Sequence, residues 1–214
     1  KLQRFHILGG EPFLQKDLHR LLDYLETRDH PELEFNIVTN LSLNRRLLTP
    51  SLDRLAALKN NNKIKRIDLQ VSIDAWDLSQ QYVRYGLDLD VFDQNMNYII
   101  DQSAYRIGLL STVSSLSIHG FPALADKYLN WNKKQTIFWY MHLVLPSNSV
   151  FDPTIFDFET FEHSLQQTRA LLPDQTWDDK RTIEVFDGIV AKLQSNCRTD
   201  VERQKALLSF LETN

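Results

Sequence analysis

The sequence predicts an α/β domain built on a parallel β-sheet, followed by a helical C-terminal extension. Short apolar or alternating runs typical of strands recur up to about residue 146, and helical patterns separate them. From Phe151 onwards only helical patterns follow. Because strands that alternate with helices form βαβ units, the sheet should be parallel. Five such strands fit either a partial (β/α) barrel or a doubly wound sheet.

The predicted elements alternate along the chain. Strands are expected at Arg4–Leu8, Glu34–Thr39, Arg66–Asp74, Tyr105–Ser114 and Thr136–Val144. Helices are expected after Pro12, after Thr49-Pro50, over Val91–Gln102 and over Pro122–Leu129, with a polar connector from Trp76 to Asp90. Three more helices are expected over Phe158–Leu172, Trp177–Leu193 and Val201–Leu211. We therefore expect a barrel-like domain over residues 1–146 and a helical extension over residues 147–214.

Composition excludes several classes of function. The net charge of -4 gives no basic surface for nucleic acid, and no apolar run is long enough to cross a bilayer. No leader pattern opens the chain, so we expect a cytoplasmic protein. The single cysteine, Cys197, excludes an internal disulfide and a multi-cysteine metal site, and no histidine pair has zinc-ligand spacing. His142 could be a core residue or could act near a substrate.

Polar residues and glycines gather at the ends of three consecutive predicted strands. Two of the chain's six glycines lie in the turn Gly9-Gly10-Glu11-Pro12, where positive φ angles would let the backbone approach a ligand. The next strand ends in Thr39-Asn40, and the third places Ser72 and Asp74 on one face. Because ligands of parallel α/β proteins bind at the carboxyl ends of the strands, these residues predict one ligand site.

The ordered set Gly9-Gly10-Glu11-Pro12, Val38-Thr39-Asn40 and Val71-Ser72-Ile73-Asp74 resembles the radical S-adenosylmethionine (radical SAM) enzymes. Their partial (β/α)6 barrel carries a GGEP-type turn after the second strand, a TN(G) ending after the third and an S-x-D ending after the fourth. The segment Tyr82-Val83-Arg84-Tyr85-Gly86 is similar to a stretch found in members with SPASM or twitch extensions. The resemblance covers roughly residues 4–146.

The resemblance implies a binding site for S-adenosylmethionine. Carbonyls of Gly9 and Gly10 would accept from its ammonium group, with Glu11 and Pro12 shaping the turn. Ser72 and Arg84 would hold its carboxylate, and Asp74 or Asn40 its ribose or the nearby loop. Thr39-Asn40-Leu41 lacks the family's glycine, and Asn40 could adopt the left-handed backbone instead. The substrate would be a small molecule or a peptide, and the intact enzyme would need a reductant protein.

The family's cluster-binding motif is not found in this sequence. Cys-x3-Cys-x2-Cys binds a [4Fe-4S] cluster and would precede Lys1, so we expect the chain to be a fragment that lacks the first βα unit. Alone it should be unable to perform the radical reaction, because the cluster supplies the electron. Two alternatives remain. One is a cluster-free barrel that binds a nucleoside or an amino-acid ligand, and the other is a (β/α)-barrel enzyme whose GGEP turn is coincidental.

Overall fold

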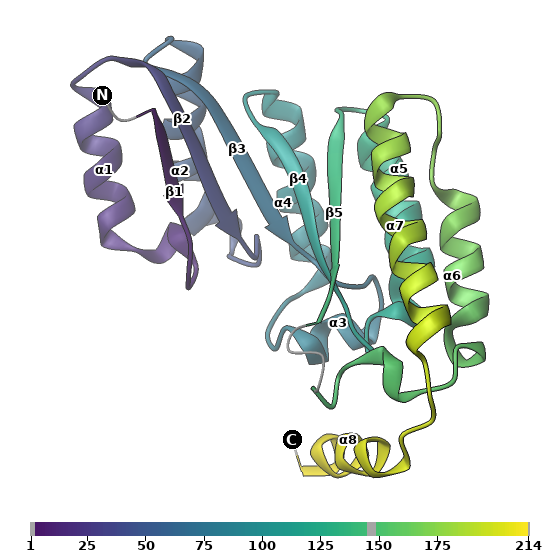
Figure 1. The fold of residues 1–214 in the computed structure, drawn as a ribbon. Coiled ribbons are helices and arrows are strands. Elements are labelled where there is room, and N and C mark those ends of the chain that lie inside the picture. Colours follow the sequence, from purple (N-terminus) through teal and green to yellow (C-terminus); the bar gives the residue numbers. More distant parts are fainter. Residues whose placement is uncertain (1–2, 145–148, 214) are drawn as a thin grey trace. The chain divides into compact units, whose positions relative to one another are not determined.

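The fold is that of a computed structural model, which describes residues 3–144 and 149–213. Its sheet is all-parallel and has five strands in the order β1-β2-β3-β4-β5, namely β1 (Arg4–Ile7), β2 (His30–Thr39), β3 (Ile64–Ser72), β4 (Arg106–Val113) and β5 (Ile137–Leu143) (Figure 1). The predicted parallel α/β class is therefore confirmed. Within the described residues the strand order does not reverse, so these five strands contain no switch point of the doubly wound kind.

Helices follow the strands as the alternating pattern predicts. The helices in the first part of the chain are α1 (Lys16–Glu26), α2 (Arg45–Asn60), α3 (Leu78–Val83), α4 (Leu89–Gln102) and α5 (Phe121–Asn132). The helical C-terminal segment is confirmed as α6 (Glu159–Leu171), α7 (Trp177–Asn196) and α8 (Val201–Thr213). Short 3-10 turns lie at η1 (Pro12–Leu14), η2 (Ile118–Gly120) and η3 (Pro153–Ile155).

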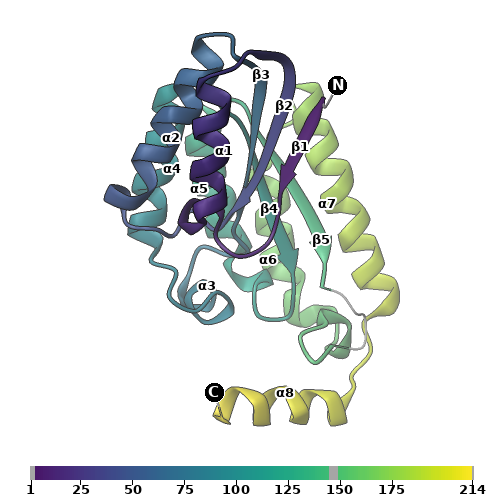
Figure 2. The same cartoon turned by 90° about the vertical axis from the view of Figure 1, so that its left-hand side faces the viewer.

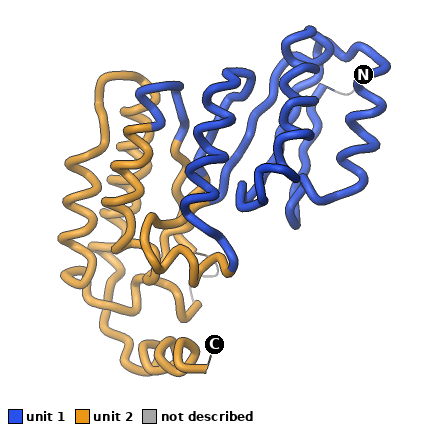
Figure 3. Tube along the Cα trace, turned by 180° about the vertical axis from the view of Figure 1, so that it is seen from behind, with its two compact units in different colours: residues 1–72, 86–109, 131–138 blue, residues 73–85, 110–130, 139–214 orange. Residues whose placement is uncertain are grey.

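The chain forms two compact units that each draw on several segments (Figure 3). Unit 1 contains residues 1–72, 86–109 and 131–138, and unit 2 contains residues 73–85, 110–130 and 139–214. The division passes through β4 and β5, whose first residues belong to unit 1. The predicted domain boundary between residues 146 and 147 lies outside the described residues and stays a prediction.

Unit 1 is built on strands β1 to β3, with α1 and α2 lying beside them (Figure 2). Strand β2 alternates buried and half-buried residues, and its register sets Phe35 beside Ile67 and Ile37 beside Leu69. All four of these side chains are fully buried, as is Leu52 on α2. Burying large apolar side chains contributes about 1.5–3 kcal/mol each, so this layer stabilises the strand ends that carry the candidate site.

The opposite face of these strands carries a network of ion pairs. The Glu34 carboxylate accepts hydrogen bonds from Arg4, Lys65 and Arg66, each at 3.0 Å. The bond from Lys65, together with the charge of Arg66, lowers the pKa of Glu34. Asp68 accepts from Arg66 Nε at 3.0 Å. Asp68, on the polar face of β3, is therefore paired with another residue of the protein.

Three local predictions were wrong. Helix α2 begins at Arg45 rather than at Thr49-Pro50, because the Asn44 side chain caps it by accepting from Arg46 N at 2.9 Å. The expected connector from Trp76 to Asp90 contains α3 and the first residues of α4. Strand β3 ends at Ser72, so that Asp74 lies beyond the ladder.

Unit 2 has an aromatic core. Phe121 and Tyr128 on α5 both pack against Trp139 of β5, with ring centroids 6.0 and 5.2 Å apart. The Trp139 indole donates to Ser111 Oγ at 2.9 Å, which satisfies its only polar atom. Burial raises the pKa of Tyr128 to about 12, with a further contribution from the nearby charge of Asp179. These residues hold the carboxyl halves of β4 and β5 together within the unit.

Candidate functional site

The Gly9-Gly10 turn follows β1 in unit 1 and has the backbone that its sequence predicts. Both glycines have positive φ, +89° for Gly9 and +58° for Gly10. A Cβ atom added at Gly9 would meet nothing within 4 Å, so open space lies beside this residue. The Gly9 carbonyl accepts from Gln15 Nε2 at 3.0 Å, which fixes its direction and leaves a second lone pair.

Glu11 joins this turn to the end of the neighbouring strand β2. Its two carboxylate oxygens accept from Thr39 Oγ1 at 2.8 and 2.9 Å, and one accepts from the backbone N–H of Asn40 at 3.1 Å. The other accepts from Phe13 N at 3.4 Å and caps the η1 turn, whose Pro12 is buried. Glu11 is therefore occupied in holding the two strand ends in register, and Thr39, at 1% exposed, is inside the protein.

The position after Asn40 carries the left-handed backbone. Leu41 has a φ of +52°, whereas Asn40 is not among the positive-φ residues, so the expectation for Asn40 was wrong. Leu41 is fully buried, and its carbonyl accepts from the buried Asn95 Nδ2 at 3.0 Å. A non-glycine residue in this conformation costs of order 1–3 kcal/mol and persists only where the surroundings fix it. Burial and the Asn95 bond supply that constraint.

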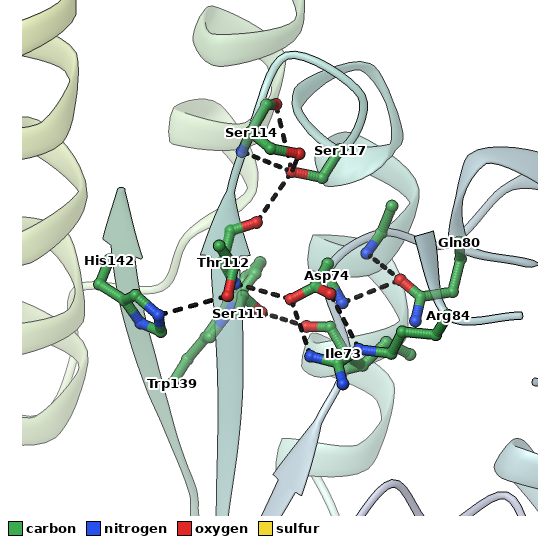
Figure 4. A network of polar contacts seen from close by, with 11 residues as sticks. Ile73, Asp74, Gln80, Arg84, Ser111, Thr112, Ser114, Ser117, Trp139 and His142 are labelled. Carbon is green, nitrogen blue, oxygen red and sulfur yellow. Dashed lines mark hydrogen bonds and ion pairs between the residues drawn. The ribbon is translucent and has the colours of Figure 1, made fainter. Parts of the chain in front are cut away.

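Asp74 and Arg84 form a buried ion pair in unit 2 (Figure 4). Arg84 Nε donates to Asp74 Oδ2 at 2.8 Å, and the other oxygen of Asp74 accepts from Thr112 N at 2.7 Å. The Asp74 side chain is 2% exposed and that of Arg84 is 27% exposed. Asp74 therefore orients the guanidinium group, while Arg84 remains reachable from solvent.

The backbone around Asp74 is fixed by Gln80 on α3. The Gln80 carboxamide oxygen accepts from the N–H groups of Asp74 and Ala75, at 2.9 and 2.8 Å (Figure 4). Gln80 is fully buried, so these two amides are satisfied without water.

The structure thus places the predicted site residues in two sets. Unit 1 brings together the Gly9–Pro12 turn, Thr39 and Asn40, and it also contains Ser72, which is 8% exposed at the end of β3. Unit 2 brings Asp74 and Arg84 together.

Four further residues escaped the sequence analysis or were assigned a different role. Gln15 and Gln80 bind backbone groups at two predicted turns, and neither position carries a recognisable motif. Thr112 lies between Asp74 and His142, whose Nε2 is 3.3 Å from Thr112 Oγ1 (Figure 4). His142 is exposed, so its interpretation as a core residue was wrong.

The unit 1 residues suit a ligand with an amino-acid head group, and Arg84 in unit 2 suits a carboxylate. Backbone carbonyls beside open space at a positive-φ turn can accept from an ammonium group, and a guanidinium donates in pairs to a carboxylate. The Gly9 carbonyl in unit 1 is thus of the chemical type that could accept from an ammonium group such as that of S-adenosylmethionine.

An iron–sulfur cluster does not fit the residues present. No group of three or more histidine, cysteine, aspartate or glutamate side chains suited to a metal occurs in the described part of the chain. Cys197 is buried, and burial, aided by the charge of Asp152, raises the pKa of its thiol, so the thiolate that metals bind is disfavoured. The described residues therefore provide no ligand set for such a cluster.

Two further findings complete the description. Within residues 3–144 and 149–213, no helix combines the length and apolar character that a bilayer crossing requires. Comparison of the chain with protein-family models and with curated proteins found no significant match.

Proposed function

We propose that the chain is part of a radical SAM enzyme of the twitch or SPASM-like type, and that it contributes the S-adenosylmethionine site. The observation that carries this proposal is the attachment of the Gly9-Gly10 turn to Thr39 and Asn40 through Glu11. A GGEP turn held to a TN ending is the arrangement that the resemblance implies. Leu41 supports it further, because it adopts the backbone of the glycine that the family carries there.

The proposed fold is a partial (β/α) barrel. The sequential strand order supports this, because a barrel is wound in one direction. In this proposal the carbonyls of Gly9 and Gly10 in unit 1 accept from the ligand's ammonium group. Arg84 in unit 2, oriented by Asp74, is a carboxylate-binding residue by the chemistry of its guanidinium group. Ser72 and Asn40 complete the contacts to the carboxylate and the ribose.

The radical chemistry itself would depend on residues outside this sequence. The chain holds one cysteine, and a [4Fe-4S] cluster needs several thiolate ligands. The coding sequence upstream of Lys1 tests this part of the proposal. Three cysteines at x3 and x2 spacing are expected there, and a start codon directly before Lys1 would contradict the assignment.

Binding of S-adenosylmethionine tests the site in the chain itself. We expect Gly9→Ala to weaken binding in isothermal calorimetry at least tenfold, because alanine disfavours a φ of +89° and the carbonyl would turn away. Gly188→Ala on α7 is the matched control, since its Cβ also meets nothing within 4 Å and its φ is not in the left-handed region. Equal binding by the Gly9→Ala protein and the parent chain would contradict the site assignment.

The second candidate is a cluster-free barrel that binds a nucleoside or an amino acid without radical chemistry. The attachment of the Gly9-Gly10 turn to Thr39 and Asn40 supports this candidate too, because these groups could contact a ligand without a cluster. Binding of adenosine or methionine by the chain, together with an upstream sequence free of the cysteine motif, would select this candidate.

A further inference from the structure

Unit 2 contains a cavity of about 710 Å³ that none of the predicted site residues lines. It lies where β4 and β5 end, and its wall includes Thr112 of β4 together with Ser114 and Val144, which directly follow the two strands. Helix α3 contributes further wall residues, among them Val83, and α8 contributes Phe210. The volume is within the range of small-molecule sites, about 300–1,000 Å³.

The described residues that line the cavity carry no charged side chain, and several of them are aromatic. Four of its residues are aromatic, namely Tyr82, Tyr85, Phe151 and Phe210. Phe151 and Phe210 meet edge to face, with ring centroids 5.2 Å apart, so the rings are already held in place within unit 2. An apolar, ring-lined wall without a charged side chain is complementary to an uncharged aromatic ring and penalises a charged group, which would lose its hydration there.

The wall also carries polar residues, among them Thr112. The hydroxyl group of Thr112 shares a hydrogen bond with the imidazole of His142, at 3.3 Å (Figure 4). A hydroxyl has one hydrogen to donate and two lone pairs, so Thr112 can accept a further hydrogen bond with either tautomer of His142. The backbone of Thr112 is fixed separately, because its N–H donates to Asp74 and its carbonyl accepts from Ser117 Oγ at 3.0 Å.

We propose that this cavity binds an uncharged aromatic ring whose edge carries a hydrogen-bond donor, such as an indole or a phenol, with the donor directed at Thr112. Binding of the ring requires only unit 2. That this ring belongs to the enzyme's substrate is an inference that rests on the proposed function. The ring could belong to a free amino acid or to an aromatic residue of a peptide, and these two sources share the same chemistry.

Paired probes test the proposed hydrogen bond to Thr112. Binding of indole and of 1-methylindole to the chain is measured by calorimetry, because the chain's own four tryptophans would obscure a fluorescence signal. One hydrogen bond contributes about 0.5–1.5 kcal/mol net, so indole should bind about two- to tenfold more tightly than its methylated analogue. Thr112→Val, which keeps both backbone contacts, should abolish this preference while 1-methylindole still binds. A preference that survives the substitution would overturn the assignment of Thr112.

A second pair of variants tests the location. Val83 lines the cavity on α3 and is 36% exposed, whereas Val185 lies on α7 and is 37% exposed. Val83→Trp should place a bulky ring in the cavity and weaken indole binding at least fivefold, and Val185→Trp should leave it unchanged. Far-ultraviolet circular dichroism verifies that both variants fold. Equal binding by the two folded variants, or no binding of indole by the parent chain, would overturn the proposal.

The two possible sources of the ring are separated by comparing zwitterionic tryptophan with N-acetyltryptophanamide. Tighter binding of the neutral amide supports the proposal with a peptide as the source, and tighter binding of the amino acid supports it with a free metabolite. S-Adenosylmethionine binding is measured on the same variants. If Gly9→Ala loses S-adenosylmethionine binding and still binds indole, the two sites are distinct. If the parent chain does not bind S-adenosylmethionine, the proposed function is contradicted, whereas the ring site is not.

Discussion

Thr39 Oγ1 donates to both carboxylate oxygens of Glu11, 28 residues earlier in the chain, at 2.8 and 2.9 Å. The same hydroxyl accepts from Leu41 N at 2.9 Å, so one side chain links the glycine turn to the backbone after β2. A buried hydroxyl that both donates and accepts in this way fixes the distance between two neighbouring strand ends.

Replacing Glu11 with glutamine should destabilise unit 1. A carboxamide is neutral and offers one acceptor oxygen where the carboxylate offers two, so the bonds to Thr39 and Asn40 cannot all form. Hydrogen bonds to charged groups contribute about 1.5–3 kcal/mol, and we expect Glu11→Gln to lower the free energy of unfolding by about 2 kcal/mol in urea titrations. Glu32→Gln, at an exposed position on β2, serves as the control and should change it by less than about 0.5 kcal/mol.

Asn95→Ala tests the constraint on Leu41. Asn95 Nδ2 donates to the carbonyls of Leu41 and Leu43 at 3.0 and 2.9 Å, and its side chain is buried. Loss of both bonds should cost about 2–3 kcal/mol of stability, because two carbonyls lose their donor near a backbone in the left-handed conformation. Asn97→Ala on the same helix, α4, should cost less than about 1 kcal/mol. Similar losses for the two variants would show that the Leu41 backbone does not depend on Asn95.

Asp74→Asn tests how much the buried ion pair contributes to the free energy of unfolding. Asp74 and Arg84 meet at 2.8 Å with the carboxylate side chain 2% exposed, whereas Asp187 and Arg169 meet at the same distance with side chains 50% and 45% exposed. Breaking a buried pair costs about 3–5 kcal/mol, and a surface pair contributes about 0–1 kcal/mol. We therefore expect a loss near 3 kcal/mol for Asp74→Asn and under about 1 kcal/mol for Asp187→Asn in thermal or urea unfolding.

The alkylation rate of Cys197 should depend on folding and on pH. Burial first, and the charge of Asp152 second, raise the pKa of the thiol from its ordinary value of 9.0. Because the thiolate reacts, iodoacetamide at pH 8 should modify the folded chain at least tenfold more slowly than the chain in urea. With a raised folded-state pKa, the favourable contribution of the protonated thiol is present below pH 9.0 and is lost as the pH rises through the folded-state value. Cys197→Ser removes the reaction, and equal rates with and without urea would contradict the burial.

The glycine turn and the buried face of β3 were predictable because their signals are local. Gly9-Gly10 permits a positive-φ turn, and the alternation around Leu69 fixes which face of β3 is buried. Helix α3 was missed because its six residues are too few for a helical period to show, and its N-cap contact, Asp77 to Ser79 N at 2.9 Å, looks like any polar turn.

The contacts that position Asp74 could not be predicted in the same way. Thr112 is 38 residues away from Asp74 in sequence, and no pattern in either strand signals that its amide meets this carboxylate. Gln80, which holds the turn after β3, is a glutamine in a polar stretch where an exposed side chain would be the ordinary expectation. The residue types indicated which polar groups could bind a ligand. Which of these groups contact one another depends on tertiary packing, which the sequence pattern does not reveal.

The amide of Thr112 offers a direct spectroscopic report on unit 2. Most strand amides bond to neutral carbonyls, but this one donates to a carboxylate at 2.7 Å, so its proton chemical shift depends on the charge and position of Asp74. A carboxylate arriving at Arg84 would draw the guanidinium away from Asp74, and a ring arriving at the Thr112 hydroxyl would move the same residue from the other side. One backbone resonance would therefore register both events and show whether they influence each other.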